Sequence, residues 1–123
     1  MTTMDLTAAT FEQTVTGEGI VLVDFWAEWC GPCQMFAPVY EQVSAEHDDI
    51  VFGKVDTEAE QALAAGFGIR SIPTLMAFRD GVMVFAQPGA LPETALESLI
   101  GQVRALDMTE VRAKAEQAQA EAA

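Results

Sequence analysis

The sequence feature that most constrains the fold is the run at residues 20–26 (IVLVDFW), a nearly unbroken stretch of aliphatic and aromatic side chains. Its length suits a strand, and a strand without alternating polar positions is buried on both faces. Sheets buried on both faces need helices to cover each face, which is the arrangement of α/β proteins. This single run therefore predicts an α/β fold with a central sheet between layers of helices.

The rest of the chain alternates between helical and strand-like patterns. In chain order we predict a helix at 7–15, a strand at 20–26, a helix at 33–47, a strand at 50–55, a helix at 58–65, strands at 74–78 and 82–87, and a helix at 92–106. Thr57 and Glu60 have the spacing of a capping box for the third helix. Asp80-Gly81 favours a tight hairpin, so the last two strands should be antiparallel. Strands joined through helices favour parallel pairing, so the sheet should be mixed.

The chain has 123 residues, of which 50% are hydrophobic, enough for one domain with its own core. We assign residues 1–106 to that domain. Residues 107–123 change character to an Ala- and Glu-rich polar segment. Pairs at helical spacing, such as Glu110 with Lys114, support a solvated helix there, so we expect a frayed C-terminal extension.

The charge balance excludes two classes of partner. Six Lys and Arg face 19 Asp and Glu, a net charge of -13, which repels nucleic acids and anionic membrane surfaces.

The first twenty residues hold no Lys, no Arg and no continuous apolar run, so they do not form a signal peptide. No segment approaches the length of about 18 apolar residues that a membrane-spanning helix needs. We expect a cytoplasmic protein.

The two cysteines, Cys30 and Cys33, lie where the buried strand meets the next helix. A thiolate at a helix N-terminus is stabilised by the unpaired N–H groups and the helix dipole, so the pKa of Cys30 should fall. Cys33 lies one turn inside and should be shielded. Three residues apart, the two sulfurs are within bonding reach, so the pair can close a disulfide and expel a group attached to Cys30.

Two other interpretations of the cysteine pair remain. A zinc half-site would need two more ligands, but the chain has no third cysteine. Its only histidine, His47, lies at the far end of the same predicted helix, roughly 20 Å from Cys33 at the helical rise. We therefore expect no metal site. Two inert buried cysteines are the second alternative.

Asp24 is the one carboxylate in the buried strand. Such a group is costly when ionised and unpaired, so burial should raise its pKa toward neutrality. A carboxylate with that pKa is able to take a proton from a buried thiol. The alternative is a carboxylate that only caps or pairs structurally. Lys54, in the neighbouring predicted strand, either reaches Asp24 or points to solvent.

An ordered set of motifs resembles the thioredoxin family. The set consists of residues 23–38 (VDFWAEWCGPCQMFAP), 54–56 (KVD), 68–75 (GIRSIPTL) and 89–90 (GA). The resemblance spans residues 6–106 in order and at family-like spacings, so it is far more specific than a lone CxxC pair. It implies a thioredoxin fold, with a central mixed sheet and helices on both faces.

The resemblance also implies roles for individual residues. Cys30 resembles the attacking cysteine and Cys33 the resolving one, with Asp24 as the buried acid and Lys54 as its neighbour. Pro73 resembles the family's cis-proline, which frees the backbone of Ile72 to pair with an extended substrate. The implied docking surface, mostly apolar, comprises Trp29, Gly31, Pro32, Ile72, Pro73, Gly89 and Ala90. Without the resemblance, Trp29 and Ile72 would be interpreted as core residues and the glycines as turn residues.

The implied function is the reduction of protein disulfides by a monomer without a bound cofactor. Its partners would be oxidised proteins and a thioredoxin reductase that uses NADPH to regenerate the dithiol. An oxidase or isomerase is a rival within the class, and a non-redox binding module is a rival outside it. Three features depart from the family: Gln34 replaces a frequent basic residue, only residues 4–6 could supply the N-terminal strand, and 107–123 lie outside the pattern.

Overall fold

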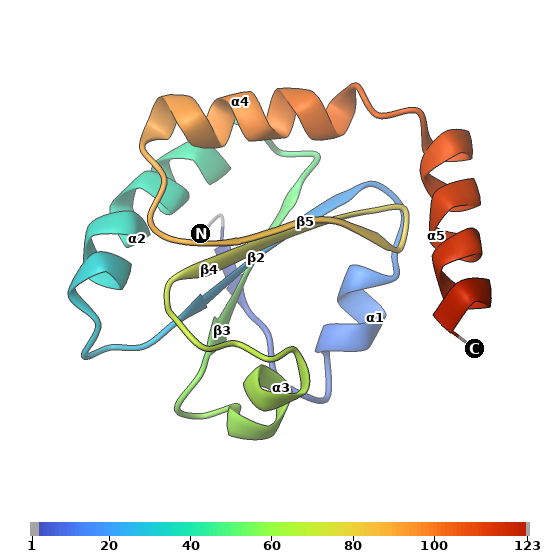
Figure 1. Ribbon diagram of the computed structural model, residues 1–123. Coiled ribbons are helices and arrows are strands. Elements are labelled where there is room, and N and C mark those ends of the chain that lie inside the picture. Colours follow the sequence, from blue (N-terminus) through green and yellow to red (C-terminus); the bar gives the residue numbers. More distant parts are fainter. Residues whose placement is uncertain (1–2, 123) are drawn as a thin grey trace.

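The strand predicted from the buried run is the centre of the sheet. In the computed structural model, which describes residues 3–122, this strand, β2 (Ile20–Trp26), lies between β3 and β4 (Figure 1). The other described strands are β1 (Thr3–Asp5), β3 (Val51–Asp56), β4 (Thr74–Arg79) and β5 (Val82–Pro88). The described helices are α1 (Phe11–Val15), α2 (Gly31–Ser44), α3 (Gln61–Gly66), α4 (Glu93–Arg104) and α5 (Met108–Ala122).

The sheet is mixed, as predicted. Its order is β1-β3-β2-β4-β5, with β1 and β2 parallel to β3, and β4 antiparallel to both β2 and β5. Asp80 and Gly81, between β4 and β5, both have positive φ angles, 51° and 84°. Two such residues form the tight turn that matches the twist of a hairpin, which explains the strong signal of Asp-Gly. The Asp80 carboxylate also accepts a hydrogen bond from the N–H of Gly19 at 2.8 Å.

Helices cover both faces of the sheet (Figure 1). Alternate residues of β2 point to opposite faces. Leu22 packs with Phe36 and Tyr40 of α2 and with Leu96 of α4, whereas Val23 belongs to a second cluster with Phe11 of α1. Asp24 therefore lies on the face of the sheet that α2 and α4 cover.

Two predicted helices begin later than expected. The helix predicted at 7–15 starts at Phe11, because the Thr10 hydroxyl accepts a hydrogen bond from the N–H of Thr7 and forms a separate turn. The capping box predicted for 58–65 is wrong. The Thr57 hydroxyl donates to the carbonyl of Trp26, and the Glu60 carboxylate accepts from the N–H of Ala8, so neither caps α3, which begins at Gln61.

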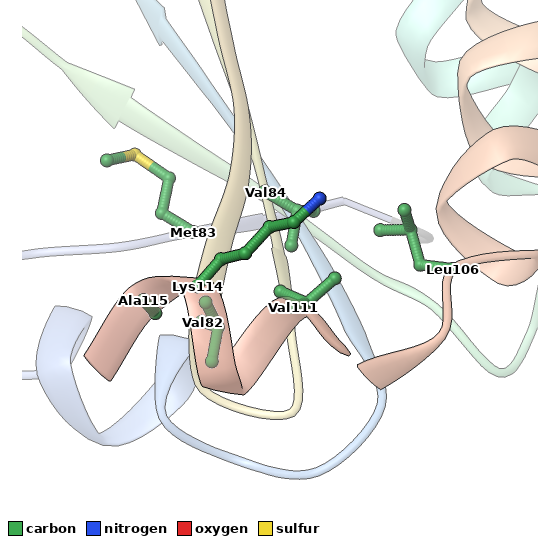
Figure 2. A pocket seen from close by; sticks show the side chains of 7 residues that line it. All are labelled: Val82, Met83, Val84, Leu106, Val111, Lys114 and Ala115. Carbon is green, nitrogen blue, oxygen red and sulfur yellow. The ribbon is translucent and has the colours of Figure 1, made fainter. Parts of the chain in front are cut away.

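Residues 108–122 form a continuous helix, α5, which lies against β5. A groove of about 340 Å³ separates them, lined by Val82, Val84 and Leu106 on one side and by Val111 on the other (Figure 2). Figure 2 shows the side chain of Lys114 extending across this groove. The predicted ion pair forms, with Lys114 Nζ at 3.1 Å from the Glu110 carboxylate.

Gly53 in β3 is a close-packing position. A Cβ atom there would lie 2.5 Å from Cδ1 and 3.1 Å from Cγ of the buried Leu6. We expect Gly53→Ala to lower the free energy of unfolding by about 1–3 kcal/mol, because Leu6 has to leave its packed position. Urea denaturation measures this value. Gly101→Ala, at an open position within α4, is the matched control and should instead stabilise by about 0.5–1 kcal/mol. Equal effects of the two substitutions would refute the packing argument.

Candidate active site

The cysteine pair lies at the N-terminus of α2. Cys30 is the N-cap residue, in an extended conformation, and Cys33 lies in the first helical turn after Pro32. The two are joined as a disulfide with their Cα atoms 5.2 Å apart. Their spacing on the first turn therefore brings the sulfurs together as the sequence predicts.

The two sulfurs differ in their hydrogen bonds rather than in their exposure. Both residues are 3% exposed, so the expected contrast between an accessible Cys30 and a shielded Cys33 is absent from this disulfide form. Sγ of Cys30 accepts a hydrogen bond from the N–H of Cys33 at 3.1 Å and lies 3.6 Å from the carbonyl oxygen of Ile72. The N–H of Cys33 and the N-terminus of α2 are groups that would stabilise a negative charge on this sulfur.

The residues of the expected docking surface come from three separate segments: 29–32, 72–73 and 89–90. The Ile72-Pro73 peptide bond is cis, and the carbonyl of Pro73 accepts a hydrogen bond from the N–H of Gly89 at 2.8 Å. This bond ties the loop before β4 to the end of β5. Trp29 is 68% exposed, so it is not a core residue. Gly31, Pro32, Gly89 and Ala90 are also exposed, whereas Ile72 is half-buried and Pro73 is buried.

Two neighbours of the cysteine pair, Met35 and Gln34, have surroundings that were not predicted from the sequence. Met35 is 76% exposed, although its helical spacing from Val39 and Val43 favours a place on the apolar face of α2. Phe36, the next residue in the helix, is buried, and adjacent residues of a helix point in different directions. This difference in direction would have distinguished the buried face of α2 from the exposed face that carries Met35. The side-chain amide of Gln34 donates a hydrogen bond to the carbonyl of Glu28 at 2.5 Å and so ties α2 to the segment that carries Trp29.

Asp24 is buried without a hydrogen-bond partner. Asp24 is 1% exposed, and no group within residues 3–122 forms a hydrogen bond with either oxygen of its carboxyl group. Burial raises the pKa of Asp24 from the ordinary value of 3.8 to about 7, and the positive charge of Lys54 lowers it in part. A structural carboxylate that caps or pairs would have a partner, so this environment favours a role in proton transfer.

Lys54 lies beside Asp24 in the sheet, because the two residues are register partners in β2 and β3. Its ammonium group is 4.8 Å from the centroid of the Trp26 ring, at the distance of a cation–π contact. The lysine thus interacts with Asp24 through its charge, without a direct ion pair between the two groups.

Removing the charge of Lys54 tests this interaction. We expect Lys54→Met to raise the pKa of Asp24 above about 7, because the effect of burial then acts unopposed. Carbon-13 NMR of the carboxyl group measures the titration directly. Lys114→Met removes a charge from α5 instead and should leave it unchanged. An Asp24 pKa that is the same in all three proteins would show that Lys54 does not act on it.

The described residues contain no set of metal ligands. No group of three or more His, Cys, Asp and Glu side chains within 3–122 is placed to hold a metal ion. His47 instead contacts Glu97 at 2.5 Å through Nε2 and Arg104 at 3.2 Å through Nδ1. Across the same residues, every helix is too short or too polar to cross a membrane.

A disulfide that closes onto a helix N-terminus can accept two electrons and release them again as the pair opens and re-forms. The fold and the cysteine pair make this protein a thiol–disulfide oxidoreductase that reduces protein disulfides through Cys30 and Cys33. The family model described as Thioredoxin matches residues 2–102. The chain belongs to the thioredoxin family.

Individual relatives agree with this assignment. A Streptomyces coelicolor protein assigned as thioredoxin 2 is 61% identical over 120 residues, covering 98% of this chain and 90% of the relative. Thioredoxin 1 of Synechococcus elongatus is 48% identical over 97 residues, covering 77% and 91% of the two chains. The crystal structure of Malassezia sympodialis thioredoxin matches with a TM-score of 0.73 and 35% identity, over 81% of this chain and 89% of that one. The Streptomyces match extends into residues 107–123, beyond the family model.

Proposed function

We propose that Cys30 is the attacking cysteine and Cys33 the resolving cysteine. The Cys30 thiolate attacks one sulfur of a substrate disulfide, forms a mixed disulfide and releases the other sulfur as a thiolate. The Cys33 thiolate then attacks Sγ of Cys30, closes the intramolecular disulfide and releases the second substrate thiolate. Two electrons pass to the substrate. The observation that supports this order is the N–H of Cys33, which points at Sγ of Cys30 and would stabilise the thiolate there.

We propose further that Asp24 accepts the proton of Cys33 before the second step. Its pKa of about 7 and its unpaired oxygens are what a proton acceptor for a buried thiol requires. Lys54 tunes that pKa and is a positioning residue, since it acts on the sulfur only through Asp24.

The substrate, in this proposal, lies as an extended segment across the docking surface. The backbone of Ile72 pairs with it, while Trp29, Pro32 and Ala90 supply apolar contacts. Backbone pairing gives affinity that does not depend on the substrate's side chains, as a reductase of many proteins needs.

For the cellular setting, we propose a cytoplasmic monomer with a domain at 1–106 and an extension at 107–123. It binds neither nucleic acid nor membranes and holds no cofactor. A thioredoxin reductase would regenerate the dithiol with electrons from NADPH. Purified protein, thioredoxin reductase and insulin test this: NADPH should be oxidised in proportion to the insulin disulfides reduced. Light scattering that shows a stable oligomer would refute the monomer.

A glutathione buffer separates a reductase from an oxidase or isomerase. We expect the Cys30–Cys33 pair to have a more negative reduction potential than glutathione, so glutathione disulfide should oxidise it almost completely. Alkylation of the remaining thiols, followed by mass spectrometry, gives the reduced fraction. A pair that stays reduced in an oxidising buffer would instead indicate a protein that donates disulfides.

A further inference from the structure

A groove extends from the docking surface between the loop before β4 and the end of β5. Its volume is about 250 Å³, and its lining includes Phe67, Ile69, Arg70, Met76, Gln87 and Pro88. Both sides of the groove continue directly into the docking surface, since Ile72 follows Arg70 by two residues and Gly89 follows Pro88. The hydrogen bond from Gly89 to Pro73 holds the two sides together.

Arg70 is the one free cation among residues 3–122. The other five Lys and Arg side chains are engaged: Lys54 with the Trp26 ring, Arg79 with carbonyls at the end of α4, Arg104 with Asp49, Arg112 with the carbonyl of Asp80, and Lys114 with Glu110. Arg70 is exposed and has no such contact. In a chain with a net charge of -13, an unpaired guanidinium beside the docking surface is a distinct local charge.

We propose that Arg70 determines specificity by selecting substrates that carry Asp or Glu close to the disulfide cysteine. This inference rests on the substrate docking proposed above. Two residues of extended chain span at most about 7 Å, so a substrate segment paired with Ile72 passes within side-chain reach of Arg70. The apolar lining of the groove accommodates the methylene groups of the acidic side chain, while the guanidinium pairs with its carboxylate.

Peptide disulfides that differ only in one residue beside the cysteine test the proposal. The residue is Glu, Gln or Lys, and the second-order rate of reduction is measured by stopped flow. Wild-type protein should reduce the Glu peptide about two- to fivefold faster than the Lys peptide, the range expected of an exposed ion pair. Arg70→Gln should remove this preference and Arg70→Glu should reverse it. High salt should weaken the preference of wild-type protein.

Arg112→Gln is the matched control, because it removes the same charge from α5. A preference that survives Arg70→Gln would overturn the proposal. So would an equal loss in Arg112→Gln, since the effect would then come from net charge. Wild-type protein that reduces none of the peptides would refute substrate docking itself, a result distinct from equal rates for all three peptides, which would refute only the role of Arg70.

Discussion

Replacing Cys30 with serine should reduce the rate of insulin-disulfide reduction to that measured without protein. A hydroxyl group at physiological pH neither attacks a disulfide nor forms a stable bond with the substrate sulfur, so no mixed disulfide can form. The turbidity of precipitating insulin chains, followed with dithiothreitol as the electron source, measures the rate. Because Cys30 has an extended N-cap conformation that serine also favours, the fold should be retained, which circular dichroism checks.

Cys33→Ser is the control that separates the two sulfurs. This variant keeps the attacking thiolate, so it should form the mixed disulfide and then stop there. Mass spectrometry should show substrate covalently bound to Cys33→Ser and none bound to Cys30→Ser. If neither replacement lowers the turnover rate, the cysteine pair is incidental and the chain is a binding module on a thioredoxin scaffold.

Replacing Asp24 with asparagine should slow the resolving step by about 10²- to 10⁴-fold and leave the first attack almost unchanged. Only the resolving step needs a proton removed from Cys33, and general-base catalysis contributes about that much. Stopped-flow fluorescence separates formation of the mixed disulfide from its release. Asp49→Asn, which removes an exposed carboxylate bound to Arg104, should change neither rate. Equal rates in Asp24→Asn and wild type would contradict the proton-acceptor role.

The same substitution should change how stability depends on pH. Between about pH 4 and pH 7 the unfolded chain has lost the Asp24 proton while the folded chain still holds it, so stability falls as pH rises through this window. From 3.8 to about 7, at about 1.4 kcal/mol per unit, the loss is on the order of 4 kcal/mol. Asp24→Asn lacks this titration. The free energy of unfolding of the variant, measured relative to that of wild type, should therefore increase toward pH 7. Urea denaturation of wild type and Asp24→Asn, each in its disulfide form, at a series of pH values measures the difference. A difference independent of pH would mean that Asp24 has an ordinary pKa.

The sequence predicted the buried parts of the structure best. β2 begins and ends where the run at 20–26 predicts. A strand that is buried on both faces is apolar along its whole length, so the ends of the apolar run mark the ends of the strand. The hairpin followed from Asp80 and Gly81, whose positive φ angles suit few other residues. The N-terminal strand, expected only within 4–6, is the short β1 at Thr3–Asp5. Cys30 and Cys33 lie as their spacing on a first helical turn requires.

The features that the sequence missed depend on contacts between distant segments. The capping box at Thr57 failed because Trp26 and Ala8, remote in sequence, offered its two side chains other partners. The burial of Cys30 in the disulfide form depends on its packing with Ala27 and Ile72, from two separate segments. A hydrophobic or capping pattern describes one segment at a time, so it cannot show that a residue from a distant segment offers an alternative hydrogen-bond partner or packing contact.

Both borders of the sheet are poor templates for another protein's strand. Among the described residues β1 spans only Thr3–Asp5, and β5 lies beside α5 near its start and ends at Pro88, which has no N–H to offer. A disulfide reductase repeatedly meets polypeptides with exposed extended segments. Because both edges of the sheet are blocked, an extended chain should pair only at the proposed docking loop around Ile72, and the protein should resist co-aggregation with the polypeptides whose disulfides it reduces.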